Sequence, residues 1–202
     1  MKFHRQDEDM TTSNIQDDTH RTKGVLRRFV RNAKGSVVIE FAALALPFSL
    51  LIFAILESCI SFAGQQVLSN VADDVARQFR TGQIRPADIE ERPNLVRDKI
   101  CAKLDVLVAS GCPELEIDLK SYDTFREAAA KRIAFTGTGR NKDIDTTGFG
   151  IDVGSSGSKN QLRVFYRWPV MTDFMRKSMS NLKDGKTLLF ASVTWQNEPF
   201  DD

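Results

Sequence analysis

Histidine and cysteine are the residue types whose placement most limits the chemistry that this chain could perform. The two histidines, His4 and His20, come before the long uncharged run that begins at Phe41, whereas Cys101 and Cys112 come well after it. If that run crosses a membrane, the two groups lie on opposite sides. The residues after the run then have no histidine for a Ser-His-Asp set, a Cys-His pair or a zinc site. We therefore expect no catalytic residue, no cofactor and no metal, in a protein that is not an enzyme.

A calcium site can be judged from spacing, because calcium-binding loops place their carboxylates at fixed positions. The stretch Asp143-x-Asp145-x-Thr147-Gly148 begins like such a loop. Its twelfth position is Gly154, where the loop needs a glutamate that holds calcium with two oxygens. This departure argues against a calcium site.

One stretch of the sequence is apolar enough to cross a membrane. No charged residue occurs from Phe41 to Leu56, and apolar residues resume after Glu57 as far as Ala63. A membrane-spanning helix needs about 20 residues, so the flanking residues must contribute. We predict a cytoplasmic leader at 1–35, disordered and then basic, a transmembrane helix at 36–64 and an exported soluble domain at 65–202. A cleaved secretory signal is the alternative, but its apolar region has only about 7–15 residues.

The charges around this run predict its orientation. Basic residues cluster just before it, at Arg21, Lys23, Arg27, Arg28, Arg31 and Lys34. Because Lys and Arg beside a span stay in the cytoplasm, we expect a single-pass inner-membrane protein with a cytoplasmic N-terminus and a periplasmic C-terminal domain. Residues 65–202 hold 20 Lys and Arg and 20 Asp and Glu. They lack the basic stripe typical of nucleic-acid binding, so we expect the membrane as a partner and no nucleic acid.

Apolar spacing predicts the helices of the exported part. Val67, Val71, Val75 and Phe79 recur every four residues, which predicts one helix from about Ser36 to Thr81. A second helix is expected after Pro93, as far as about Ser110. A short helix is expected at 170–180.

Strands are expected at 115–119, 162–168 and 187–195. In the first of these, Leu115, Ile117 and Leu119 alternate with polar residues that include Asp118. Residues 124–135 favour a short helix leading into a strand at 132–135, and 136–160 a long loop or weak hairpin. The predicted fold is α+β, with antiparallel strands packed on the long helix.

The entry to the apolar run has a pattern of its own. Gly35 follows the basic stretch, and Glu40 comes five positions later at the start of the apolar helix. This resembles the site that prepilin peptidases cut on the cytoplasmic face, which places the cleaved bond between Gly35 and Ser36. The alternative is a flexible glycine before an anchor whose glutamate reaches the headgroups.

The whole stretch from Arg28 to Arg80 resembles the TadE-like family. It has the basic residues, the Gly-x-x-x-x-Glu-Phe entry, a Leu/Ile/Phe-rich run with a late glutamate, and an Ala/Val-rich amphipathic helix. The chain end at 193–200 and the Cys101…Cys112 pair before a strand are also similar to that family. The resemblance implies a pseudopilin-type component of the tight-adherence (Tad/Flp) pilus and secretion system. The related TadF-type proteins have a similar length, and that alternative stays open.

Two glutamates lie in or beside the predicted span. In pilin-like helices, a glutamate at the position of Glu40 can meet the new N-terminal amine of a neighbouring subunit, which offsets the cost of burying either charge. Glu57 lies past the middle of the run. Its carboxylate either pairs with a partner helix or reaches outward, and the sequence leaves both alternatives open.

The cysteines fall into two groups. Cys59 lies in the predicted span and is interpreted as an apolar filler. Cys101 and Cys112 are separated by 11 positions, a spacing that suits a disulfide in an oxidising exported compartment. Two free, buried thiols are the alternative.

Together these features predict a minor pseudopilin-like membrane protein of Flp/Tad pilus assembly or secretion, cleaved after Gly35. Its expected partners are a prepilin peptidase, other pilin-like subunits and pilus assembly proteins. The alternative is an uncleaved, membrane-anchored exported binding module.

Overall fold

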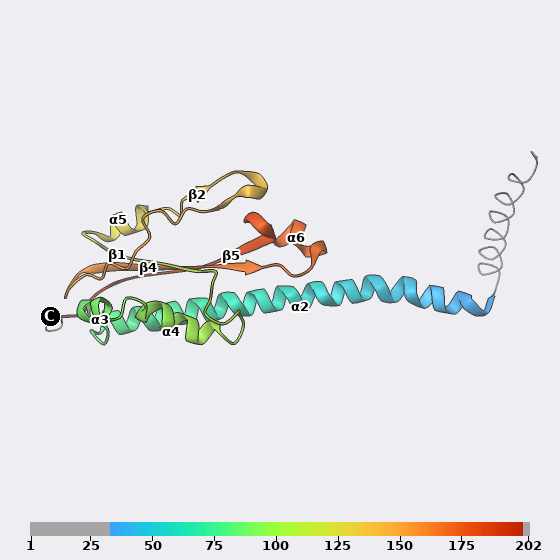
Figure 1. Cartoon of the computed structure of the whole chain (residues 1–202), viewed down its shortest axis with the longest axis horizontal. Coiled ribbons are helices and arrows are strands. Elements are labelled where there is room, and N and C mark those ends of the chain that lie inside the picture. The colour runs from blue at the N-terminus through green and yellow to red at the C-terminus, as the bar shows by residue number, and fades with distance from the viewer. Residues whose placement is uncertain (1–32, 200–202) are drawn as a thin grey trace, which may run out of the picture. The chain divides into compact units, whose positions relative to one another are not determined.

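The computed structural model describes residues 33–199 (Figure 1). The chain divides into two compact units, Met1–Phe53 and Ala54–Asp202. The long helix α2 (Ala33–Arg80) contributes residues to both units.

Helix α2 contains the apolar run predicted to span a membrane. Its residues from Val37 onward form the one helix within 33–199 that is long and apolar enough to cross a bilayer, and no residue of its most apolar window is buried. Pro47 lies inside this helix. Its exposed apolar side chains include Val37, Phe41 and Phe48. Such a surface is stable only against lipid or other apolar helices.

The second unit is built on a three-stranded antiparallel sheet with the strand order β1-β4-β5. The strands are β1 (Leu115–Tyr122), β4 (Lys159–Pro169) and β5 (Lys186–Gln196). In this register Leu119 pairs with Leu162, which pairs with Val193 on the other side. The predicted α+β class with antiparallel strands is confirmed.

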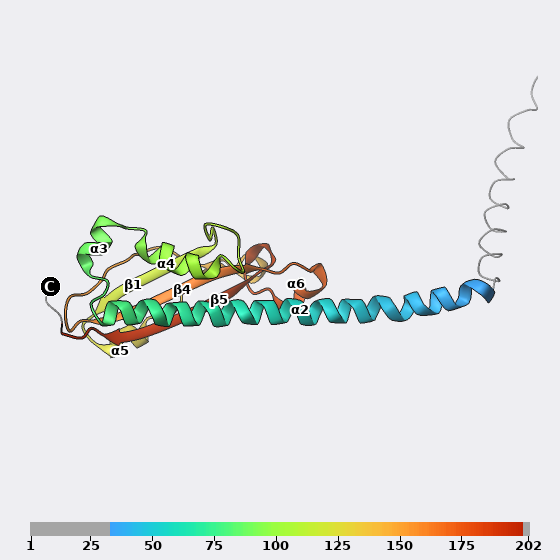
Figure 2. The ribbon, with the colours of Figure 1, turned by 90° about the horizontal axis from the view of Figure 1, so that it is seen from below.

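One face of the sheet packs on helices. In Figures 1 and 2, α3 (Pro86–Glu91), α4 (Leu95–Leu104) and the C-terminal part of α2 lie along this face. The predicted stripe on α2 is confirmed, since its Val and Phe residues at 71, 75 and 79 are all buried in the core. Phe79 stacks on Trp195 of β5 with ring centroids 6.2 Å apart. Burying each such side chain contributes about 1.5–3 kcal/mol, which attaches α2 firmly to the sheet.

The opposite face of the sheet is covered by the segment between β1 and β4. This segment holds α5 (Phe125–Ala130), β2 (Phe135–Thr136), the short helix η1 (Gly139–Asn141) and β3 (Asp143–Ile144), and Figure 1 shows α5 and β2 across the sheet from α2. The expected strand at 132–135 is shifted to 135–136, where it pairs with β3. Ile151 forms a parallel bridge with Leu119 at the edge of the sheet. Strand β4 is therefore buried on both faces.

The helix predicted between Pro93 and Ser110 is shorter in the structure. It is α4, which ends at Leu104. A helix continued to Ser110 would carry the chain about 13 Å away from Cys101. The Cα atoms of Cys101 and Cys112 are 5.8 Å apart, so the chain has to turn back before that. Gly111 takes part in this turn with φ of 80°.

Three short helices flank the strands of the second unit. The sequence analysis missed α3, which has Pro86 in its first turn. The connection from β4 to β5 contains α6 (Asp173–Met179) and the short helix η2 (Lys183–Gly185). A helix was expected at 170–180, and its existence is confirmed. Thr172 is its N-cap residue.

Candidate functional site

The predicted cleavage site lies at the beginning of α2. Gly35 and Ser36 belong to its first turn, and Glu40 follows about one turn later on an exposed part of the helix. The candidate cleavage bond and the candidate pairing carboxylate therefore belong to one continuous helix, which also carries the exposed apolar surface.

Glu57 has partners within its own chain, an arrangement that neither alternative from the sequence describes. Its carboxylate accepts hydrogen bonds from the backbone N–H groups of Met171 and Thr172 and from the Thr172 hydroxyl. These donors belong to the N-terminus of α6, where a negative charge is favoured because the first N–H groups of a helix have no partner inside it. Glu57 is only 9% exposed. Glu57 and Thr172 are 115 positions apart, so no local pattern could have joined them.

Ser58, Gln65 and Gly64 extend the contact of α2 with the rest of this unit. The Ser58 hydroxyl lies 3.8 Å from the sulfur of Met179 on α6. The Gln65 side chain donates to the carbonyl of Phe190 at 2.8 Å and accepts from its N–H at 3.1 Å. It therefore gives hydrogen-bond partners to backbone groups on the open side of the edge strand β5. A Cβ atom at Gly64 would lie 2.8 Å from the nearest atom of the Trp168 ring. Glycine thus permits the close approach of helix and sheet, a role that the sequence analysis missed.

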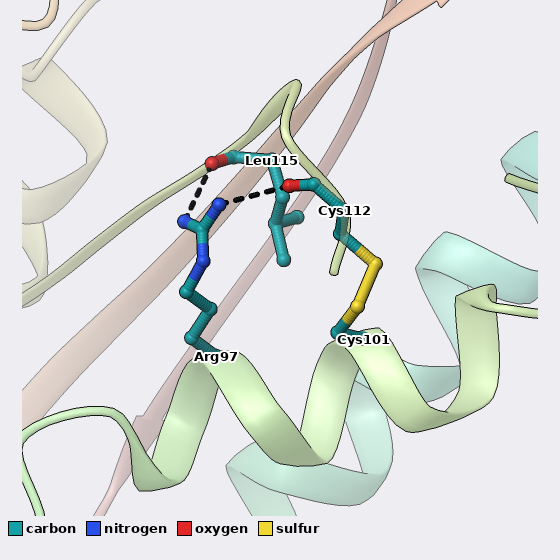
Figure 3. Close-up of a disulfide and its surroundings, with 4 residues drawn as sticks. All are labelled: Arg97, Cys101, Cys112 and Leu115. Atoms are coloured by element: carbon teal, nitrogen blue, oxygen red, sulfur yellow. Dashed lines mark hydrogen bonds between the residues drawn. A yellow bond between two sulfur atoms is a disulfide. The ribbon is translucent and has the colours of Figure 1, made fainter. Parts of the chain in front are cut away.

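Cys101 and Cys112 form a disulfide, one of the two alternatives that the sequence allowed (Figure 3). It joins α4 to the turn before β1. One helical turn before Cys101, Arg97 donates to the carbonyl oxygens of Leu115 at 2.9 Å and of Cys112 at 2.8 Å. The disulfide and Arg97 therefore hold the same turn from two positions on α4. Cys59 is a free, exposed cysteine on α2.

Removing the disulfide should lower the stability of the second unit without affecting membrane insertion. A bridge that closes so short a loop contributes about 2–3 kcal/mol. We expect the Cys101→Ser/Cys112→Ser variant to lose that much free energy of unfolding in urea, followed by the fluorescence of the buried Trp168 and Trp195. Cys59→Ser is the matched control and should stay within about 0.5 kcal/mol of wild type. Alkylation of both thiols in the native, unreduced protein would contradict the bridge.

The second face of the sheet carries a buried ion pair. The alternation along β1 places Asp118 on the polar face of that strand, opposite the core residues Leu115 and Leu119, yet its side chain is only 1% exposed. The alternation predicted the apolar face correctly, but the segment between β1 and β4 covers the other face as well. Arg163 of β4, 5% exposed, donates from Nε to the Asp118 carboxylate at 3.1 Å. Each buried charge therefore has an oppositely charged partner instead of water.

A second ion-pair cluster lies beside this pair. Arg167 of β4 donates to Asp143 at 2.9 Å and to Glu116 at 3.0 Å, and Lys183 lies 3.2 Å from Asp143. Burial alone would raise the pKa of Asp143, but the hydrogen bonds from Arg167, Lys183 and the Ile144 N–H outweigh it and lower the pKa below its ordinary value. The stabilisation from this carboxylate is therefore present above the ordinary aspartate pKa and is lost as the pH falls through the lower, folded value. These contacts hold β3 on the sheet.

The end of the chain closes the second unit. Asn197 accepts from the Trp195 indole N–H at 2.8 Å and donates to the carbonyls of Gly154 and Ser155. The Glu198 N–H donates to the carbonyl of Arg80, the last residue of α2. The end of the described chain thus fixes the C-terminus of α2 and the turn before β4.

No candidate metal centre emerges from the part of the chain that the structure describes. Across residues 33–199, no group of three or more His, Cys, Asp and Glu side chains could hold a metal ion. The candidate site is the long helix α2, with its entry at Gly35 and its carboxylates at Glu40 and Glu57.

The comparisons with known proteins point to the same helix. Residues 35–77 match the family model described as TadE-like protein. The predicted resemblance is confirmed for this segment, which we call the TadE-like segment. It lies entirely within α2 and contains Gly35, Glu40 and Glu57. No curated protein and no solved structure matches the chain.

Proposed function

We propose that this chain is a minor pseudopilin-like membrane protein that takes part in Flp/Tad pilus assembly or the related secretion. The observation that carries the proposal is the coincidence of two features on one helix. The TadE-like segment, residues 35–77, contains the long, exposed apolar surface of α2. A TadE-like helix suggests involvement in Tad/Flp pilus assembly, and its role there is structural and not enzymatic.

In this proposal a prepilin peptidase cuts between Gly35 and Ser36. The mature chain then begins at Ser36, and Glu40 becomes its fifth residue. In the bilayer, the Glu40 carboxylate pairs with the N-terminal amine of a neighbouring pilin-like subunit. Such a pair offsets much of the cost of placing either charge near hydrocarbon.

The proposed topology follows from the basic residues before the helix. They stay in the cytoplasm, at the inner membrane, and the second unit contacts assembly partners on the periplasmic side. The disulfide between Cys101 and Cys112 fits this placement, because disulfides persist in the oxidising periplasm.

Deletion of the gene for this chain should abolish or strongly reduce surface pili, and expression of the wild-type chain should restore them. Glu40→Ala should restore several-fold fewer pili, because the neighbour's amine loses its partner. Glu90→Ala on the exposed side of α3 is the matched control and should restore wild-type numbers. Pili are counted by electron microscopy at equal protein levels. A deletion strain with normal pili would contradict the proposal and favour an anchored binding module.

A further inference from the structure

Helix α6 and the residue before its N-cap carry a patch that the proposed function does not use. Met171 is 75% exposed and Phe174 is 67% exposed. They are three positions apart, and the exposed basic residues Arg176 and Lys177 follow. Arg176 also pairs with Asp173 at 2.7 Å. We call the four residues Met171, Phe174, Arg176 and Lys177 the α6 patch.

The contacts of Glu57 and Ser58 fix the position of this patch along α2. The Met171 and Thr172 N–H groups donate to Glu57, and Met179 contacts Ser58. Helix α6 therefore lies beside the turn of α2 that contains Glu57. Figures 1 and 2 show α6 next to α2. A helix that begins at Val37 crosses the hydrocarbon core in about 20 residues, as far as Leu56. The remainder of the predicted span, residues 57–64, then lies in the outer headgroup layer. The α6 patch thus lies where the outer surface of the membrane is expected.

Helix α2 also has exposed apolar side chains in the turns around Glu57. The side chains of Leu56, Ile60 and Phe62 are all exposed. Met171 and Phe174 thus add exposed apolar side chains on α6 to those on α2 in the same part of this unit. The position of α6 beside the end of the predicted hydrocarbon span favours lipid over a separate protein partner as the occupant of the patch.

The charges near the patch suit a lipid headgroup layer. From Val170 to Lys186 the chain has four basic and two acidic residues. Lys183 pairs with Asp143 and Lys186 with Glu114, so the exposed cations nearest the apolar side chains are Arg176 and Lys177 on α6. Interfacial helices place apolar side chains about 5–10 Å into the boundary between headgroups and acyl chains, with Lys and Arg among the phosphates.

We infer that α6 inserts into the outer interface of the membrane that α2 crosses, with Met171 and Phe174 at the acyl boundary and Arg176 and Lys177 among anionic headgroups. This inference rests on the proposed membrane span. It gives Glu57 a physical role, because its carboxylate holds the N-terminus of α6 at the membrane surface and is itself shielded from hydrocarbon by the donors of Met171 and Thr172.

Site-directed labelling of the full chain tests this placement. In a Cys59→Ser background the remaining native cysteines are bridged, so a single new thiol can be labelled with the fluorophore NBD. The labelled sites are Met171→Cys and Phe174→Cys, with Phe125→Cys on α5 as the exposed control and Phe48→Cys as the span control. The proteins are placed in vesicles of phosphatidylcholine and phosphatidylglycerol and quenched by a lipid nitroxide or by aqueous iodide.

We expect the lipid nitroxide to quench the labels at 171 and 174 several-fold more than the label at 125, and iodide to quench them less. Equal behaviour of 171, 174 and 125 would overturn the inference while the span at Phe48 remains lipid-quenched. Protection of 171 and 174 from both quenchers would also overturn it, because protein and not lipid would then cover the patch. A label at Phe48 that lipid does not quench would refute the proposed span itself, and this inference with it.

Discussion

Arg163→Met should destabilise the second unit by about 3–5 kcal/mol, because it leaves a buried carboxylate without its cation. The side chains of Arg163 and Asp118 are both buried. After the substitution, Asp118 keeps an N–H donor from Gly150 at 3.3 Å and a distant Lys120 at 3.9 Å. Urea unfolding followed by tryptophan fluorescence measures the loss, since both tryptophans are buried in the core.

Two further variants separate this effect from a loss of packing. Arg80→Met removes an exposed ion pair to Glu198 and should cost no more than about 1 kcal/mol. The double variant Asp118→Leu/Arg163→Met removes both charges and should recover most of the lost stability. If Arg163→Met lowers the free energy of unfolding no more than Arg80→Met does, Asp118 does not depend on Arg163 for a buried counter-charge.

Gly35→Leu should leave the 35-residue leader attached in cells with an active prepilin peptidase. The proposed cut lies directly after Gly35, and a leucine side chain there would fill the space that the glycine leaves open to the peptidase. Gly35→Ala adds one methyl group and should slow cleavage without preventing it. Intact-mass measurement on chains isolated from membranes distinguishes the two lengths.

Gly24→Leu is the control for this substitution, since Gly24 lies in the same leader but outside the Gly35…Glu40 pattern. It should be cleaved like wild type. Normal cleavage of Gly35→Leu would show that the bond lies elsewhere or that the glycine is not recognised.

The sequence predicts best those elements whose signals are local and repeated. The four-residue spacing of Val67, Val71, Val75 and Phe79 predicts the buried face of α2, because a helix returns to the same side after about 3.6 residues. Alternation predicts strand β1 and its apolar face. The apolar run and its basic flank predict the candidate span and the match at 35–77.

Other features depend on contacts between residues far apart in the chain. Asp118 alternates like a surface residue, but the segment between β1 and β4 covers it and brings Arg163 opposite it. Glu57 is a carboxylate within an apolar run, and only the fold shows that Thr172 is its partner. The apolar pattern predicts a helix that is longer than α4. Helix α4 ends early because the chain must turn back to bring Cys112 beside Cys101.

The N-terminal residue of the wild-type chain tests the central claim most directly. The chain is purified from membranes of cells with and without the prepilin peptidase, and its first residue is determined by sequencing and intact mass. A processed pseudopilin should begin at Ser36 when the peptidase is present and at Met1 when it is absent. A chain that begins at Met1 in the presence of active peptidase would contradict the proposed processing and the pseudopilin role that depends on it.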